Sequence, residues 1–434
     1  MQAEFFGTSF DCPCGRRHTI VPRRSIYADD ATTQLAQACG GLTAGRRAIV
    51  LMDSRTKVAA GDDVAAAFEA AGWRVTRAHV PDRAGGRSPV CDDITRRGLD
   101  PLLGEADLIC PAGAGVVNDL GKWIATDRKL IYVTFATAAS MNGYTSANIA
   151  PTIGGLKRLL EGTAVQIVAT SPRVLSAAPR ELTTAGLGDV LAKSVSSADW
   201  YANHLLFGDY YCQRGVKLIE EIEPLYLKAG SPLGSASALE ALYEALLLTG
   251  AAMTMAGTST PASGSEHLFS HYLDMAAGVD GCEHDLHGRQ VGVGTILAAE
   301  LYRRVLAVES PRFSPPAETV DTARWGAAAG EVAAEYAKKL PRLRQARERL
   351  SRGGAWDELR AKLAPMLRPP EMIRDCLATA GGAWKAEHIG CSKDRVLEAF
   401  ARGHEIRSRF TVLDLARLVG VMPISAGEIV EQWM

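Results

Sequence analysis

The chain has 434 residues, which is enough for two or three domains with separate cores. Hydrophobic residues make up 47% and charged residues 22%, a composition that excludes wholesale disorder. The 48 basic and 49 acidic residues give a formal net charge of −1. Because nucleic-acid and membrane-surface proteins usually carry a basic excess, we expect a globular protein that binds no nucleic acid.

Two further features bear on the compartment. The nine cysteines are scattered and odd in number, which does not fit a disulfide framework in a chain of this length. No apolar run reaches the roughly 20 residues of a membrane span, and the N-terminus lacks the pattern of a signal peptide. The sequence therefore predicts a cytoplasmic protein without a membrane span.

The first part of the chain alternates apolar strand patterns with helical ones. Residues 47–52 predict a buried strand that ends at Asp53, residues 64–71 a helix, and residues 73–80 a strand; further strands are predicted at 108–110 and 130–135. This rhythm indicates a parallel sheet with helices on both faces. Ligands of such sheets bind at the carboxyl ends of the strands.

From about residue 185 the pattern becomes helical. Apolar residues recur at helical spacing, first at Leu187, Val190, Leu191 and Val195, and then at Leu239, Leu242, Leu246 and Thr249. We predict an α/β dinucleotide-binding domain over residues 1–180 and an all-helical domain over residues 181–434. The active site is expected in the cleft between them.

A glycine-rich turn follows the strand that begins at residue 108. Residues 110–122 read CPAGAGVVNDLGK, so a strand ends, Gly113 and Gly115 form a turn, and a helix begins near Val116. Small residues and a helix N-terminus favour a bound phosphate. Asp53 can accept hydrogen bonds from a ribose diol and would repel a 2′-phosphate, which favours NAD over NADP. The turn lacks the G-x-G-x-x-G pattern, and a plain strand–turn–helix connection remains the alternative.

Three segments of the helical region carry candidate metal ligands. His267 and His271 are four residues apart in GSEHLFSHYLDM, which places them on one helical face. His287 lies in DLHGRQV and Asp189 in GLGDVLAK. One carboxylate and two imidazoles can hold a divalent metal and leave positions open for substrate, as in catalytic sites. A capping aspartate and structural histidines are the alternative.

Longer segments carry a resemblance to a known family. The chain resembles the sn-glycerol-1-phosphate dehydrogenase family, within the superfamily of iron-containing alcohol dehydrogenases, glycerol dehydrogenases and dehydroquinate synthases. The resemblance implies a dehydroquinate synthase-like fold, with a Rossmann-like parallel-sheet domain followed by an all-α domain. It rests on the segments GAGVVNDLGK, TAASMNGYTSANIAP, AAPRELTTAGLGDVLAK, ADWYANHLLFGDYYC, GSEHLFSHYLDM, LHGRQVGVG and IRSRFTVLDLA.

The resemblance also implies roles for individual residues. Asp189, His267 and His287 would hold one divalent metal, zinc first and nickel or iron as alternatives, and His271 would contact the substrate as a proton relay or hydrogen-bond partner. Asp119 and Lys122 would fix nearby backbone. The pyrophosphate of NAD, or of NADP, would lie on Gly113, Ala114, Gly115, Val116 and Val117, and the rest of the cofactor near Thr137, Ala138, Ser140 and Ser146.

The implied activity is hydride transfer between sn-glycerol 1-phosphate and dihydroxyacetone phosphate, a reaction of phospholipid metabolism. A homodimer or larger homo-oligomer is expected by the same resemblance. Two alternatives remain: a lyase or cyclase like dehydroquinate synthase, which uses NAD transiently, and a non-catalytic cofactor-binding relative.

The sequence departs from the family pattern in one segment. The family segment PTxxSxDG reads ATAASMNG here, so Asn142 replaces a substrate-contacting aspartate and Ala136 replaces the proline. A different polyol substrate therefore becomes an alternative.

A second candidate metal site lies near the N-terminus, where CPCGRRH contains Cys12, Cys14 and His18. These three residues could bind a metal, but no second ligand pair follows at zinc-ribbon spacing. A β-hairpin with a Pro-Cys-Gly turn is the alternative.

Overall fold

The computed structural model describes residues 5–154, 156–220, 223, 233 and 235–434. Contacts within the chain divide it into two compact units. The first contains the chain up to Gly186 together with α12 (Ala236–Ala256), and the second contains Leu187–Lys217 and Thr258–Met434. The predicted boundary at residue 180 and the predicted cleft remain predictions.

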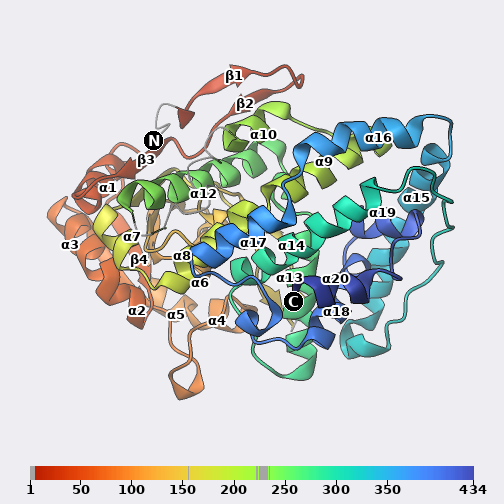
Figure 1. Ribbon diagram of the computed structural model, residues 1–434. Helices are drawn as coiled ribbons and strands as arrows, with labels where there is room; N and C mark the ends of the chain where they lie inside the picture. Colours follow the sequence, from red (N-terminus) through yellow and green to blue (C-terminus); the bar gives the residue numbers. More distant parts are fainter. Residues whose placement is uncertain (1–4, 155, 221–222, 224–232, 234) are drawn as a thin grey trace. The chain divides into compact units, whose positions relative to one another are not determined.

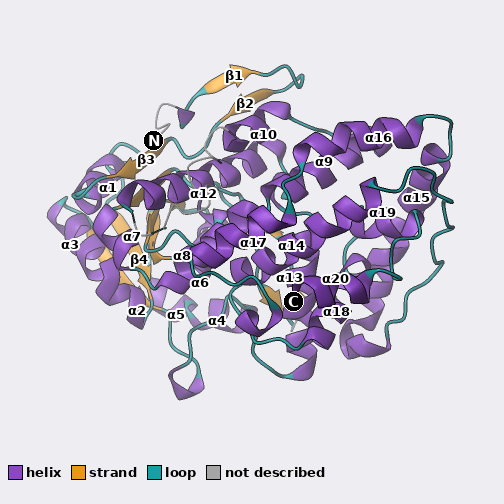
Figure 2. Cartoon of the chain, in the orientation of Figure 1, coloured by secondary structure: helices purple, strands orange, loops and turns teal. Residues whose placement is uncertain are grey.

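A seven-stranded parallel sheet forms the centre of the first unit. Its strand order is β3-β13-β8-β6-β4-β5, and β7 also pairs with β6. The predicted parallel sheet is therefore confirmed, and its strands are among those drawn in orange in Figure 2. The bounds are β3 (Arg24–Tyr27), β4 (Arg47–Met52), β5 (Arg74–His79), β6 (Leu108–Gly113), β7 (Ile131–Tyr132), β8 (Thr134–Ala136) and β13 (Ile167–Thr170).

Helices cover both faces of this sheet. Along β4, Val50 packs into one hydrophobic core with Leu35 of α1 (Ala31–Cys39) and Phe68 of α3 (Asp62–Ala70). The next residue, Leu51, packs into a second core with Leu120 of α6 (Gly115–Arg128). Since successive side chains of a strand point to opposite faces, an apolar run such as RAIVLM is the pattern of a strand buried on both sides.

The strand expected at residues 130–135 occurs as two short strands. β7 pairs with the start of β6, and β8 pairs with its end. Between these pairings lies Pro111, which has no N–H to donate to a neighbouring strand. β6 itself runs three residues further than predicted, to Gly113. The glycine turn therefore begins at the last residue of the strand, at the edge of the sheet.

Shorter elements complete the first unit. β1 (Ser9–Asp11) and β2 (Arg17–Thr19) form an antiparallel hairpin, drawn in red at the top of Figure 1. Two further antiparallel pairs are β9 (Asn148–Ile149) with β12 (Leu160–Glu161) and β10 (Thr152–Ile153) with β11 (Leu156–Lys157). The short helices are α2 (Ser54–Thr56), α4 (Asp93–Gly98), α5 (Asp100–Leu103) and α7 (Pro172–Ala177).

Beyond β13 the described residues form helices and connecting loops without a strand, so the predicted helical region is confirmed. α8 (Arg180–Leu191) begins in the first unit, and its last five residues lie in the second. The helices after it are α9 (Lys193–Phe207), α10 (Gln213–Glu220), α12, α13 (Ser265–Asp280), α14 (His287–Leu306), α15 (Ala329–Leu350), α16 (Ala355–Leu363), α17 (Pro370–Thr379), α18 (Lys393–Arg402), α19 (Val412–Leu418) and α20 (Ala426–Trp433).

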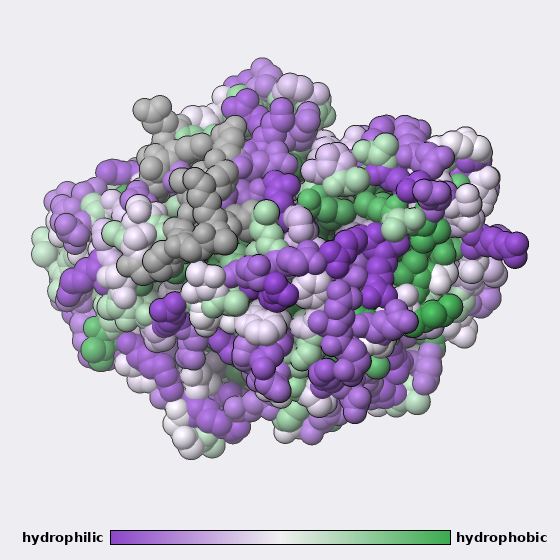
Figure 3. Space-filling view, viewed as in Figure 1, coloured by the Kyte–Doolittle hydropathy of each residue, from purple (hydrophilic) through white to green (hydrophobic). Residues whose placement is uncertain are grey.

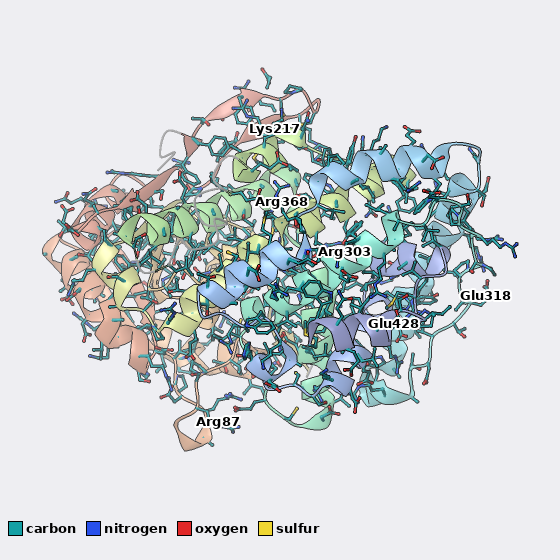
Figure 4. All side chains as sticks on the ribbon, viewed as in Figure 1. Arg87, Lys217, Arg303, Glu318, Arg368 and Glu428 are labelled. Atoms are coloured by element: carbon teal, nitrogen blue, oxygen red, sulfur yellow. The ribbon has the colours of Figure 1, made fainter. Side chains whose placement is uncertain are left out.

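Ion pairs join the C-terminal end of α14 to its neighbours in the second unit. Arg303 pairs with Glu371 of α17, and Arg304 pairs with Glu428 of α20; Figure 4 labels Arg303 and Glu428 on these helices. Glu300, one turn earlier on α14, contacts both arginines. Because Glu300 is buried, this pairing holds the helix end in one position more firmly than an exposed pair would.

Among the described residues one helix, α12, is long and apolar enough by length and composition to cross a membrane. Within the structure, 89% of its most apolar 18-residue window is buried. Burial of this kind is what a core helix of a globular unit shows, because such a helix is hydrophobic on all sides.

Candidate functional site

The structure brings Asp189, His267 and His287 together within the second unit. One ligand atom from each lies within 4.8 Å of the others. Nε2 of His267 is 3.3 Å from Oδ1 of Asp189. Two ligands of a tetrahedral ion with bonds of about 2.0–2.2 Å lie about 3.4 Å apart, so this spacing fits a divalent metal such as zinc.

Glycine allows the helices that carry these ligands to approach. A Cβ atom on Gly188 of α8 would lie 2.1 Å from the carbonyl oxygen of Gly288 on α14. No side chain fits there, and the close contact sets Asp189 beside His287, the first residue of α14. The glycine that precedes the candidate metal ligand Asp189 therefore has a packing reason.

Hydrogen bonds orient both imidazole rings. Nδ1 of His267 lies 2.7 Å from Oε1 of Glu266, and Nδ1 of His287 lies 2.9 Å from Oγ of Ser270. The Ser270 hydroxyl donates to Oε1 of Gln290 at 2.8 Å, so it accepts from His287. With Nδ1 protonated on both rings, each Nε2 presents a lone pair to a metal.

The three orienting residues were missed by sequence reasoning. Glu266 and Ser270 each directly precede a candidate histidine, and Gln290 lies three residues after His287. All three are buried polar residues, and Glu266 is fully buried. A polar residue next to a candidate ligand was the available signal, but only the fold shows which way its side chain turns.

The electrostatics of the cluster favour a cation. Burial lowers the pKa of His267, but hydrogen bonds with Asp189 and Glu266 outweigh burial and raise the pKa to about 9. Lys193, one turn after Asp189, shows the opposite balance, because burial lowers its pKa to about 7 against the pull of the same two carboxylates. The two carboxylates therefore favour a positive charge at His267, which either a second ring proton or a bound metal ion would supply.

His271, the predicted substrate contact, lies beside the cluster. It occupies the same face of α13 as His267, with ring centroids 6.1 Å apart. Its ring stacks on that of His287 at 5.5 Å. The side chain is partly exposed. A group in this position can reach a molecule bound at the metal and exchange a proton with solvent.

The glycine turn connects β6 to α6 in the first unit. Gly113 ends the strand, Ala114 is the N-cap, and Gly115 has a φ of +35°. A Cβ on Gly113 would lie 2.6 Å from Cβ of Val117, so only glycine fits there. Val116 is the second residue of the first helical turn, whose backbone N–H groups point out of the helix and can receive a phosphate.

A loop at the same edge of the sheet carries the other predicted cofactor residues. Thr137 follows β8, and its N–H donates to the carbonyl of Gly113 at 3.4 Å. Ala138 is buried and accepts a 2.7 Å hydrogen bond from Tyr144, and Ser140 is partly exposed. This places Thr137 next to the turn that would hold the pyrophosphate.

Lys122 fixes the continuation of this loop. Its fully buried ammonium donates to the carbonyls of Gly143 at 2.7 Å and Asn148 at 2.9 Å. Asn142 precedes Gly143, and Ser146 is buried between the two anchored carbonyls in sequence. The structural role expected for Lys122 agrees with these contacts.

β4 ends at Met52, one residue before the predicted end, and Asp53 follows it as the N-cap of α2. Its Oδ1 accepts from the N–H groups of Arg55 at 3.0 Å and Thr56 at 2.7 Å, and the Thr56 hydroxyl completes a capping box. A ribose hydroxyl would therefore have to bind Oδ2.

Comparison with known proteins places the chain among dehydrogenases. A family model described as iron-containing alcohol dehydrogenase matches residues 26–179. The chain is 28% identical over 418 residues to a glycerol-1-phosphate dehydrogenase [NAD(P)+] of Bacillus licheniformis, covering 95% of this chain and 93% of that protein. It is 29% identical over 410 residues to the protein of the same name from Geobacillus stearothermophilus, covering 93% and 94%.

Solved structures show the same fold. A probable glycerol dehydrogenase from Sinorhizobium meliloti superposes with a TM-score of 0.61 at 17% identity, covering 95% of this chain and 98% of that one. A 1,3-propanediol oxidoreductase gives a TM-score of 0.59 at 16% identity, with the same coverage. The chain is therefore similar in fold to these dehydrogenases, and its residues 26–179 match the iron-containing alcohol dehydrogenase model. In sequence it is similar to the glycerol-1-phosphate dehydrogenases over nearly its whole length, and the predicted resemblance is confirmed.

Proposed function

We propose that the chain is a metal- and NAD(P)-dependent dehydrogenase that interconverts sn-glycerol 1-phosphate and dihydroxyacetone phosphate. The observation that carries the proposal is the cluster of Asp189, His267 and His287, whose two imidazoles are both oriented through Nδ1. The names of the relatives support the class of reaction and the class of substrate.

The reaction moves a hydride and a proton. Oxidation removes the hydride from the carbon that bears the hydroxyl group and transfers it to C4 of the nicotinamide, while the hydroxyl proton leaves to solvent. A divalent metal held by Asp189, His267 and His287 would act as a Lewis acid on the substrate oxygen. We assign the proton to His271, which lies beside the cluster and is partly exposed.

The first unit would supply the dinucleotide site. The residues of the glycine turn, Gly113 to Val117, would hold the pyrophosphate at the N-terminus of α6. Thr137, Ala138, Ser140 and Ser146 would line the nicotinamide side, and Asp53 the ribose. These chain groups bind and orient the cofactor, while the cofactor carries the redox chemistry.

Three finer points belong to the proposal. Zinc fits the ligand set of one carboxylate and two imidazoles, and nickel and iron accept the same donors. A homodimer or larger homo-oligomer and a cytoplasmic location are expected from the family resemblance. Asn142 would contact the substrate, as the family resemblance implies for this position.

A substrate panel tests the proposal. Polyols and their phosphates are offered to the purified chain with NAD or NADP, formation of NADH or NADPH is followed by absorbance, and bound metal is measured on the same sample. We expect turnover with sn-glycerol 1-phosphate above that with unphosphorylated glycerol. Full metal and NAD occupancy without turnover on any member would point instead to a cofactor-binding relative.

A further inference from the structure

The N-terminal hairpin of the first unit gathers three metal-binding side chains. Cys12 directly follows β1 and accepts, through its carbonyl, a 2.9 Å hydrogen bond from the N–H of Gly15. The N–H of Cys12 donates to Arg16 at 2.9 Å, which closes a three-residue loop. Gly15 has a φ of +84°, the left-handed conformation that such loops require. Cys14 lies in the loop, and His18 lies on the returning strand.

The ligand atoms of these three residues lie at the spacing of a metal site. Sγ of Cys14 is 3.2 Å from Nε2 of His18, and the ligand atoms of Cys12, Cys14 and His18 all lie within 4.8 Å of one another. A tetrahedral zinc with bonds of about 2.3 Å to sulfur and about 2.0 Å to nitrogen separates its ligands by about 3.5–3.8 Å. Shifts of about an ångström or less would bring all three onto one ion.

Burial distinguishes this cluster from a chance surface grouping. His18 is 3% exposed, and its ring lies 5.7 Å from that of Phe10, the residue opposite it on the first strand. Both cysteines are partly buried, whereas Pro13 between them is exposed. At the top of the view, where the hairpin lies, Figure 3 is largely hydrophilic. The three side chains are therefore less exposed than the loop residues around them.

The hairpin is short, so the pairing of its own two strands contributes little to its folding stability. Each strand has three residues, and an isolated two-stranded hairpin is marginal in water. Metal binding can supply this stabilisation, because ligands gathered in the folded chain are dispersed in the unfolded one. Soft thiolates paired with an imidazole are the ligands that zinc prefers in structural sites.

We propose that Cys12, Cys14 and His18 form a structural zinc site, separate from the Asp189 cluster and independent of the proposed function. The two thiols lose their protons on binding, and His18 binds through the neutral Nε2 atom. A tetrahedral shell leaves one position for a further ligand. The site would fix the hairpin and would take no part in hydride transfer.

Cobalt(II) substitution of the full chain tests this directly. Thiolate ligands give Co²⁺ a strong near-ultraviolet charge-transfer absorption, and the Asp189 cluster, built from oxygen and nitrogen, cannot produce it. We expect this absorption in the unmodified chain and in His267→Ala, and its loss in Cys12→Ser and Cys14→Ser. Cys282→Ser, a change at an exposed cysteine, serves as the matched control and should retain it.

A second measurement avoids the risk that a variant fails to fold. The unmodified chain is alkylated with iodoacetamide with and without added zinc, and the modified cysteines are read by peptide mass spectrometry. Zinc should protect Cys12 and Cys14 several-fold and leave Cys282 unaffected. Absence of the cobalt absorption, equal alkylation in both conditions, or a disulfide between Cys12 and Cys14 in the freshly purified chain would each overturn the proposal.

Discussion

Nε2 of His267 lies 3.3 Å from Oδ1 of Asp189, while Nδ1 of the same ring is held 2.7 Å from Oε1 of Glu266. The ring is thus placed between two carboxylates, which raise its pKa to about 9 although burial opposes the charge. A proton and a metal ion compete for the same side of this ring.

The competition predicts that metal affinity depends on pH. Below a pH of about 9 the metal must displace the proton of His267, so the apparent affinity should fall about tenfold for each pH unit below that value. Calorimetry of zinc binding to the metal-free chain in buffers of different ionisation enthalpy measures the released proton. His284→Ala, a change at a side chain that is 45% exposed, should behave as the unmodified chain does. If the metal affinity is roughly the same from pH 6 to pH 9, a range that includes the usual pKa of histidine, His267 is not a metal ligand.

Glu266→Gln should weaken metal binding without removing a ligand. The substitution keeps an oxygen for the His267 ring but removes the charge that supports it. Loss of such an orienting partner typically costs about 10–100-fold in metal affinity. Competition with a chromophoric chelator measures the change. Glu358→Gln, at a glutamate exposed on α16, is the matched control; equal affinities in the two variants would show that Glu266 does not act on the metal.

Gly188→Ala should disrupt the metal cluster through the backbone. The new Cβ would lie 2.1 Å from the carbonyl of Gly288, so α8 and α14 must move apart. We expect a loss of stability of about 1–3 kcal/mol, as for other overpacked sites, together with reduced metal content. Gly330→Ala is the control, because that helical position has open space and alanine favours a helix there by about 1 kcal/mol. Unchanged metal content in Gly188→Ala would show that the close approach is not required.

The sequence predicted the grouping of the candidate ligands better than it predicted their surroundings. The parallel sheet, the helical second part and the grouping of Asp189, His267 and His287 followed from periodicity and from the family resemblance. The break between β7 and β8 did not, because periodicity carries no information about the missing N–H of Pro111 in the neighbouring strand.

The orienting contacts also needed the fold. Glu266 could have been an ordinary acidic residue in the first turn of a helix, and only the turn of its side chain toward His267 shows its role. Asp53 is a different case. It was predicted as a ribose ligand, and the structure adds a helix-capping role through Oδ1. Aspartate is a preferred N-cap residue, so the sequence could have suggested this second role. The two roles can be separated by experiment.

Two substitutions at Asp53 make that separation. Asn keeps a capping oxygen but loses the charge, whereas Ala loses both. We expect Asp53→Asn to raise the use of NADP relative to NAD with little change in stability. Asp53→Ala should do the same and also lower the free energy of unfolding by about 0.5–2 kcal/mol. Ratios of kcat/KM for the two cofactors and chemical denaturation measure these effects. An unchanged cofactor ratio in both variants would leave Asp53 as a cap alone.

Asn142→Asp tests the proposed substrate role of the position at which the sequence differs from the family segment PTxxSxDG. A carboxylate accepts hydrogen bonds from substrate hydroxyls more strongly than a neutral amide, by about 1 kcal/mol. We therefore expect about a fivefold higher kcat/KM for sn-glycerol 1-phosphate relative to other polyols. Asn142→Ala should lower it. If the preference among substrates is the same in all three proteins, Asn142 does not contact the substrate.

The most direct test of the metal-dependent dehydrogenase is the reduction of dihydroxyacetone phosphate by NADH, followed with metal content on the same samples. The unmodified chain and His284→Ala should be active in proportion to bound metal. His267→Ala and His287→Ala should lose the metal of the Asp189 cluster and, with it, activity by at least about 100-fold, by analogy with the upper cost of disturbing a metal site. Full activity in either ligand variant, or in chain stripped of that metal, would contradict the account.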